Sequence, residues 1–289
     1  MGKKKQQRKM LQRFLEDKLA VTGGIILLIF TLIAVFSDQL VLHDPNETNL
    51  VLQQLLPCRE YPLGTDNMGR CILSRLISGS TTTLGNAVLV LLGMLIIGVP
   101  LGIIAGNYGG IADMIIMRAV DIVCTFPSSM VALAVVSILG PGTLNIMLVL
   151  VSLWWAPLAR MVRGEVLHIK EKEFVMAAKA AGSSDFQIMV RHILPNIISP
   201  VIVYATLRVG AIIMHIAGFS FIGLGTQPPY ADWGVMLSES RDYINLAPRL
   251  MVWPGLAIML VVFSLNLVGE GLGQAIRPYG SNISRKESD

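Results

Sequence analysis

The chain has few charged residues. Asp, Glu, Lys and Arg make up 15% of its 289 residues, whereas they make up about 25% of a typical soluble domain. Hydrophobic residues make up 53%, and the mean hydropathy is +0.64. A soluble enzyme with this composition would not stay dissolved, and a disordered chain needs high charge and few apolar residues. The composition excludes both classes and favours one multi-helix membrane domain.

Motifs for metal binding and catalysis are missing as well. The cysteines, Cys58, Cys71 and Cys124, show no C-x-x-C spacing, so neither a disulfide framework nor a zinc site is indicated. No G-x-x-x-x-G-K-[S/T] loop occurs, so the chain does not hydrolyse ATP by the route that this loop serves. No pairing of a nucleophile with a base is evident. We therefore expect a protein that is not an enzyme and binds no cofactor.

Six apolar runs are present, each long enough for a spanning helix of about 20 residues. They cover residues 19–37, 84–106, 114–139, 143–161, 197–225 and 250–273. The runs predict an all-α, polytopic membrane protein with six transmembrane helices. The first run follows a basic segment, but it is too long for a signal peptide and no small-x-small cleavage site follows it. We expect it to be a retained helix.

Basic residues are distributed unevenly between the two sides that these helices define. With the N-terminus inside, the inner segments hold 17 Lys and Arg residues and the outer loops hold 5. Cytoplasmic loops carry the excess of such residues, so both termini are predicted to be cytoplasmic. These loops account for the net charge of +4 without a nucleic-acid partner. The predicted parts are a cytoplasmic N-terminal segment (1–18), a first transmembrane helix (19–37), an extracellular loop (38–83), a core of five helices (84–273) that includes the cytoplasmic loop 160–196, and a cytoplasmic tail (274–289).

Several prolines lie within the apolar runs, namely Pro100, Pro127, Pro157 and Pro254. Proline removes a backbone hydrogen bond and kinks a helix. Such breaks survive in a membrane where neighbouring helices or a cavity satisfy the freed groups, which favours a moving, cavity-lining bundle. The alternative is that the prolines only reflect their higher frequency in membrane helices.

Polar side chains lie inside two of the apolar runs. Tyr204, Arg208 and His215 in the fifth run share one helical face, and Asp121 lies in the third run. An ionisable group that faces lipid costs several kcal/mol. One interpretation is that the face lines a translocation path, with Asp121 as a counter-charge to Arg208. The alternative is a buried, satisfied packing cluster.

The cytoplasmic loop between the fourth and fifth runs predicts two short helices. The first begins near Glu173 and is rich in Ala, and Gly182 stops it. Ser184 or Asp185 can cap the second helix, and Pro195 marks the start of the fifth spanning helix. A small, Ala-rich surface of this kind would fit a groove on a partner, whereas the alternative is an ordinary amphipathic loop helix.

The residues Ala177-Ala178, Gly182 and Leu194-Pro195 resemble the "EAA" loop of permease subunits in binding-protein-dependent ABC importers. The resemblance implies that this loop forms coupling helices, which dock into an ATPase subunit. The predicted coupling residues are Glu173, Met176, Ala177, Ala178, Gly182, Leu194 and Pro195. Met176 occupies the position of the motif's Glu, so we do not expect a salt bridge from that position. The docking shape is still expected, because it rests on Ala177, Ala178 and Gly182.

Further segments resemble the dipeptide/oligopeptide/nickel subfamily of these permeases, in particular its second, C-type subunit. They are residues 63–70, 74–76, 107–113, 117–121, 126–127, 219–225, 227–229 and 233–234. The similarity extends from about residue 15 to residue 280. It implies an ABC importer type I permease fold in the cell membrane, surrounded by lipid. It also implies a homologous second permease subunit, two cytoplasmic ATP-binding subunits that use ATP and Mg²⁺, and an extracytoplasmic substrate-binding protein.

A stand-alone secondary transporter or channel is the alternative class of function. A proton-coupled carrier would hold several intramembrane carboxylates, whereas here Asp121 is the main candidate, with Glu270 near the inner end of the sixth run. Such a carrier has no need of a large cytoplasmic docking loop. The sequence therefore favours a pore subunit that partner ATPases drive.

The substrate is predicted from His215 and its neighbours. The segment 214–225 resembles the nickel branch of the subfamily, in which a His precedes this run. Neutral imidazole suits Ni²⁺ and related ions, so His215 is a candidate metal ligand. A bare ion needs three or more ligands, and His43, His168 and His192 lie outside the membrane core. We expect nickel, a related metal ion or a metal chelate, with dipeptides or oligopeptides as the alternative.

Overall fold

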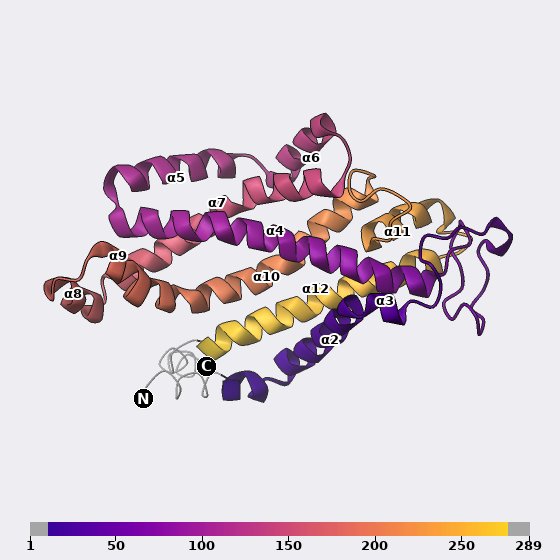
Figure 1. The fold of residues 1–289 in the computed structure, drawn as a ribbon, viewed down its shortest axis with the longest axis horizontal. Helices are drawn as coiled ribbons and strands as arrows, with labels where there is room; N and C mark the ends of the chain where they lie inside the picture. Colours follow the sequence, from indigo (N-terminus) through magenta and orange to yellow (C-terminus); the bar gives the residue numbers. More distant parts are fainter. Residues whose placement is uncertain (1–10, 277–289) are drawn as a thin grey trace, which may run out of the picture.

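The computed structural model describes residues 11–276, which form an elongated bundle of helices (Figure 1). Within this range, five helices are long and apolar enough to cross a membrane. They are α2 (Lys18–Val35), α4 (Ile72–Tyr108), α7 (Thr143–Lys170), α10 (Leu194–Phe221) and α12 (Arg249–Ile276). A bent pair, α5 (Gly110–Thr125) and α6 (Ser128–Leu139), makes a sixth passage if it is counted as one span. The predicted all-α class is confirmed.

The prediction of one continuous helix over residues 114–139 is wrong. The chain bends by 82° between α5 and α6. Phe126 takes an extended conformation (φ −99°, ψ 145°), which is the preference of a residue that precedes proline. Pro127 has no N–H to continue the helical hydrogen bonds. The apolar run is therefore divided at Phe126 and Pro127.

Two helices extend beyond their apolar runs. α4 begins at Ile72, within the predicted outer loop 38–83, and α7 continues to Lys170, beyond the predicted end at residue 161. Hydropathy does not detect these extensions because they carry charge. In α4, Arg75 is fully buried, and its Nη2 lies 3.0 Å from Oε2 of Glu239. In α7, Arg163 pairs with Asp113 of α5.

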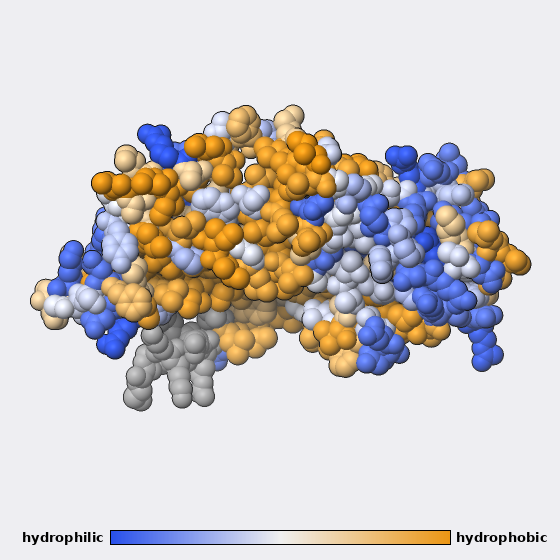
Figure 2. All heavy atoms as spheres, turned by 45° about the horizontal axis from the view of Figure 1, so that its top comes forward, coloured by the Kyte–Doolittle hydropathy of each residue, from blue (hydrophilic) through white to orange (hydrophobic). Residues whose placement is uncertain are grey.

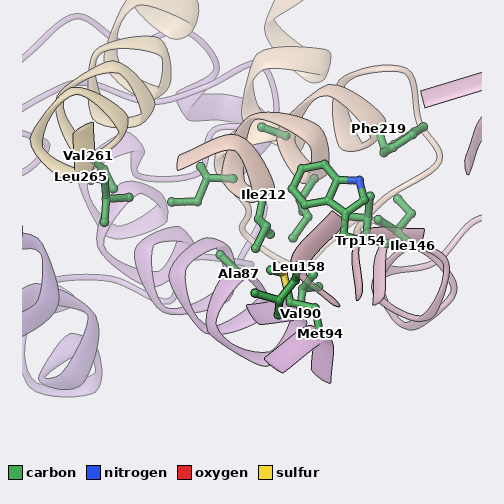
Figure 3. Close-up of a cluster of buried hydrophobic side chains, with 14 of the residues drawn as sticks. Ala87, Val90, Met94, Ile146, Trp154, Leu158, Ile212, Phe219, Val261 and Leu265 are labelled. Atoms are coloured by element: carbon green, nitrogen blue, oxygen red, sulfur yellow. The ribbon is translucent and has the colours of Figure 1, made fainter. Parts of the chain in front are cut away.

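The hydrophobic core lies where the long helices meet (Figure 3). Its buried side chains include Ala87, Val90 and Met94 of α4, Ile146, Trp154 and Leu158 of α7, Ile212 and Phe219 of α10, and Val261 and Leu265 of α12. Outside this core, apolar side chains cover the middle of the molecule, and hydrophilic residues gather toward its two ends (Figure 2). This surface pattern fits a bundle that stands across a lipid bilayer.

One end of the bundle is closed by an ordered loop that follows α3 (Ser37–Leu40) and contains η1 (Leu50–Leu52). The loop packs near α11 (Trp233–Ser240) and η3 (Arg241–Tyr243) (Figure 1). A cluster of four charged residues connects the loop to α11. In it, Arg70 Nη2 lies 2.7 Å from Glu239 Oε2, and Arg70 Nε lies 2.7 Å from Asp66 Oδ2. Arg75 completes this ion cluster.

The opposite end holds α8 (Glu173–Ala180), α9 (Asp185–Ile188) and the π-helical turn η2 (Met189–Ile193). The start of α2 and the end of α12 also point toward this end (Figure 1). Most of the predicted cytoplasmic segments 1–18 and 274–289 lies outside the described residues. The assignment of this end to the cytoplasm stays a prediction.

Candidate functional site

A cavity of about 330 Å³ opens between α4, α5, α6, α7 and α10. Its walls consist of Met94, Val123, Cys124, Phe126, Ser128, Leu153, Trp154, Pro157, Tyr204, Arg208, Ala211 and His215. The bend between α5 and α6 contributes to one wall, and the predicted polar face of α10 forms another. The structure thus brings Tyr204, Arg208 and His215 together around one cavity. Their role in a translocation path stays a prediction.

Arg208 lies halfway along α10, with its guanidinium against two aromatic rings. Its Cζ atom lies 4.9 Å from the ring centroid of Tyr204 and 5.9 Å from that of Trp154. Both contacts are within the range of cation–π attraction. Among the described residues, no carboxylate lies within ion-pair distance of Arg208.

Asp121 does not serve as the counter-charge that the sequence predicts for Arg208. Its Oδ1 atom lies 2.7 Å from Nη2 of Arg160, and its Oδ2 atom lies 4.0 Å from Nη1 of Arg118. The reason is helix packing, because α5 lies against α7, which carries Arg160. The predicted pairing of Asp121 with Arg208 is wrong.

His215 contacts both α7 and its own helix. Its Nδ1 lies 2.9 Å from the carbonyl oxygen of Ala211, and its ring meets Trp154 edge to face with centroids 4.8 Å apart. Within residues 11–276, no three His, Cys, Asp or Glu side chains are grouped so that they could hold a metal ion. His215 is thus one imidazole in an aromatic and polar cavity.

Charged side chains continue beyond the cavity on the α5 and α7 surface. The side chains of Asp121 and Arg160 are 54% and 50% exposed, and that of Arg118 is 79% exposed. Asp121 lies about one turn before Cys124, and Arg160 about one turn after Pro157. A charge that faces lipid costs several kcal/mol. This surface therefore faces water or another polar protein surface.

Trp154, Cys124 and Phe126 line the cavity, although no sequence pattern marks them as cavity residues. Each lies within an apolar run, where an apolar or aromatic side chain resembles ordinary core. The available signal was proline, because Pro127 and Pro157 are neighbours of these residues and both mark irregular backbone. Only the arrangement of the helices shows that the residues meet.

Five of the seven predicted coupling residues lie in an exposed helical hairpin of α8 and α9, and the other two, Leu194 and Pro195, begin α10. Glu173 begins α8, and Met176 and Ala177 are exposed on it. Gly182 has a φ of +82°, a conformation that favours glycine, and its N–H donates to the carbonyl of Lys179. This turn ends α8, as the sequence predicts.

The second short helix begins at a capping box. The Ser184 hydroxyl accepts from the N–H of Gln187, and the Gln187 side chain accepts from the N–H of Ser184. α9 then passes through η2 into α10, which starts at Leu194 with Pro195 in its first turn. Both boundaries confirm the predicted pattern. Phe174, Met176, Phe186 and Val190 expose apolar side chains on this hairpin.

Comparison with known proteins identifies the family. Residues 98–279 match the family described as the binding-protein-dependent transport system inner membrane component. Residues 6–57 match the N-terminal TM domain of oligopeptide transport permease C. The chain belongs to the dipeptide/oligopeptide/nickel family of ABC importer permeases. It is a multi-pass membrane subunit, and the predicted resemblance is confirmed.

Three curated relatives illustrate the range of this family. A dipeptide transport system permease protein, DppC, of Alkalihalophilus pseudofirmus is 41% identical, over 94% of this chain and 89% of the relative. A glutathione transport system permease protein, GsiD, of Pectobacterium atrosepticum is 37% identical, over 94% and 90%. A nickel transport system permease protein, NikC, of Escherichia coli is 38% identical, over 92% and 96%. These similarities do not favour nickel.

A solved structure supports the fold. The MetNI methionine ABC transporter, in inward-facing conformations, has a chain that matches 71% of this chain and 98% of its own length, with a TM-score of 0.58. The sequence identity is 20%, so this likeness shows the type I permease fold alone.

Proposed function

We propose that this permease subunit forms half of a translocation pathway and that the cavity beside Arg208 is part of its wall. The observation that carries the proposal is the row of polar and charged side chains on α5, α7 and α10. Arg208, Arg160 and Asp121 would be costly against lipid and are accessible on this single subunit. A homologous second permease that covers this face would enclose a water-filled path.

The hairpin of α8 and α9 is the proposed docking site for the ATP-binding subunits. Its exposed apolar side chains, Phe174, Met176 and Phe186, suit a groove on a soluble partner. Two such partners would hydrolyse ATP with Mg²⁺. An extracytoplasmic binding protein would deliver substrate at the other end. The description of the matching family as binding-protein-dependent supports this arrangement.

The connection between hairpin and cavity suggests how ATP hydrolysis moves the pathway. α7 leads directly into α8, and α9 leads through η2 into α10. α7 carries Trp154 and α10 carries Arg208, so a displacement of the hairpin acts on two cavity walls at once. ATP-driven closure of the partner subunits would rock these helices between outward-open and inward-open states.

For the substrate, the cavity chemistry favours a short peptide over a bare metal ion. One imidazole does not complete a metal site, whereas a guanidinium beside aromatic rings suits the charged and apolar parts of a peptide. A nickel chelate is the second candidate, because His215 faces the same cavity and the chelator would supply the other ligands.

Uptake in cells tests this choice. Labelled dialanine and labelled Ni²⁺ would be offered to cells that lack this subunit and to cells that regain the wild type or His215→Ala. We expect dialanine uptake to require the subunit and to survive His215→Ala. The opposite result is that cells without the subunit lose nickel uptake but keep dialanine uptake, and that His215→Ala does not restore nickel uptake. That result would replace the peptide assignment by the metal assignment.

A further inference from the structure

Arg208 differs in its ion pairing from four other arginines of the bundle. Arg70, Arg75, Arg160 and Arg163 each have a carboxylate within 3.0 Å. Arg208 is the one permanently charged side chain in the cavity wall, and no described carboxylate lies within ion-pair distance of it. A charge at this depth with no counter-charge is costly for a structural role.

The surroundings of Arg208 hold its guanidinium in place and leave hydrogen-bond donors free. Tyr204 and Trp154 contact it through their rings, and the Tyr204 side chain is also a hydrogen-bond partner of the guanidinium. The ring contacts occupy no N–H group, so the donors that do not bond to Tyr204 remain available to a ligand. The planar guanidinium carries five N–H donors in a fork that matches the two oxygens of a carboxylate. A ligand that brings its own carboxylate would therefore find a positioned partner.

We propose that Arg208 binds the carboxylate of the transported substrate, so that the pathway selects a molecule with a free acid group. This proposal rests on the proposed function. The C-terminal carboxylate of a short peptide would pair with Arg208, while the apolar wall of Phe126, Leu153 and Trp154 accommodates a side chain. Arg208 is thus a specificity-determining residue for the pathway.

Cys124 provides a probe within the same cavity, because it is exposed and lines the wall with Arg208. In the complete transporter in native membrane vesicles, Cys124 would be modified with an anionic or a cationic methanethiosulfonate reagent and quantified by mass spectrometry. Rates would be normalised to those of free cysteine. We expect the anionic reagent to react about tenfold faster than the cationic one, because the positive potential of Arg208 attracts it.

Variants test the origin of this preference. Arg208→Gln should abolish it, Arg208→Lys should retain most of it, and Arg241→Gln should leave it unchanged, since Arg241 is exposed in η3. If Arg208→Lys keeps the reagent preference that Arg208→Gln loses, the loss is due to the missing charge and not to a disturbed fold. Equal rates for the two reagents in the wild type, or no modification of Cys124 by either, would overturn the proposal.

Protection of Cys124 tests the ligand. We expect dialanine to slow the modification several-fold in the wild type and not in Arg208→Gln, whereas dialanine amide has no effect. Equal protection by the amide, or by chloride, would contradict carboxylate recognition. Dialanine uptake that depends on the subunit would then still support the proposed function, so the two proposals fail separately.

Discussion

Gly102 of α4 lies against the backbone of Ala159 of α7, so close that a Cβ on Gly102 would lie 2.6 Å from the Ala159 carbonyl oxygen. The same Cβ would lie 2.6 Å from the Cβ of Val162. Small residues permit such close approach of membrane helices, and here they bring α7 and its cavity residues onto α4.

Gly102→Ala should therefore destabilise the bundle by about 1–3 kcal/mol, because the new methyl group separates α4 from α7. The matched control is Gly85→Ala in the same helix, where no other atom lies within 4 Å of the new Cβ. The control should be neutral or slightly stabilising, since alanine favours helix. Thermal unfolding in detergent measures both, and equal midpoints for the two variants would refute the packing argument.

Glu239→Gln should destabilise the end of the molecule at which the loop after α3 packs near α11. It leaves Arg70 and the fully buried Arg75 with one shared carboxylate, that of Asp66. Removal of one partner from a buried ion cluster costs about 3–5 kcal/mol. Asp242→Asn is the control, since its pair with Arg241 is largely exposed and should contribute less than about 1 kcal/mol. A stability equal to that of the control would show that the cluster does not hold the loop on α11.

Asp232 gives a pH dependence of stability. Burial raises the pKa of this carboxyl above its ordinary value, while hydrogen bonds from Val235, Thr83 and Gly234 oppose the rise. The folded state thus binds the proton more tightly than the unfolded state, so stability is greatest below the ordinary pKa and falls as pH rises through the folded pKa.

The matched variant is Asp232→Asn, which retains a cap for the N–H groups of Gly234 and Val235 and does not titrate. Between pH 3 and pH 7, we expect the unfolding temperature of the wild type to fall relative to that of the variant. A relative rise over this range would mean that the carboxylate is stabilised in the folded state.

Gly182→Ala should weaken coupling without unfolding the bundle. Alanine at a φ of +82° is strained by about 1–2 kcal/mol, although no neighbouring atom obstructs its Cβ. The turn between α8 and α9 would shift, and we expect substrate-stimulated ATP hydrolysis by the complete transporter to fall several-fold. Gly164→Ala, on an open surface of α7, is the control and should retain full stimulation. Normal stimulation in Gly182→Ala would show that this turn is not part of the coupling contact.

Local patterns predicted the hairpin and the α10 face correctly. Gly182, Ser184 and Pro195 act on their immediate neighbours, so their effects are visible in sequence. Tyr204, Arg208 and His215 are placed by helical periodicity alone. In each case no residue from a distant segment decides the conformation.

Long-range contacts decided what the sequence did not predict. The early start of α4 depends on Arg75 meeting Glu239, which lies 164 positions later. The partner of Asp121 depends on α5 packing against α7, and the run 114–139 gives no hydropathy signal for its 82° bend. The cavity walls come from five helices, so the cavity too is a property of the assembled bundle.

The most direct test of the account is to fill the cavity. Ala211→Trp would place an indole in the space of about 330 Å³ beside Arg208, while Ile202→Trp, exposed on the same helix and outside the cavity wall, is the matched control. The complete transporter would be reconstituted in proteoliposomes with ATP and its binding protein, and assembly checked by gel filtration. The account predicts that ATP-driven dialanine uptake is lost in Ala211→Trp and retained in Ile202→Trp. Normal uptake by an assembled Ala211→Trp transporter would contradict the placement of the pathway in this cavity.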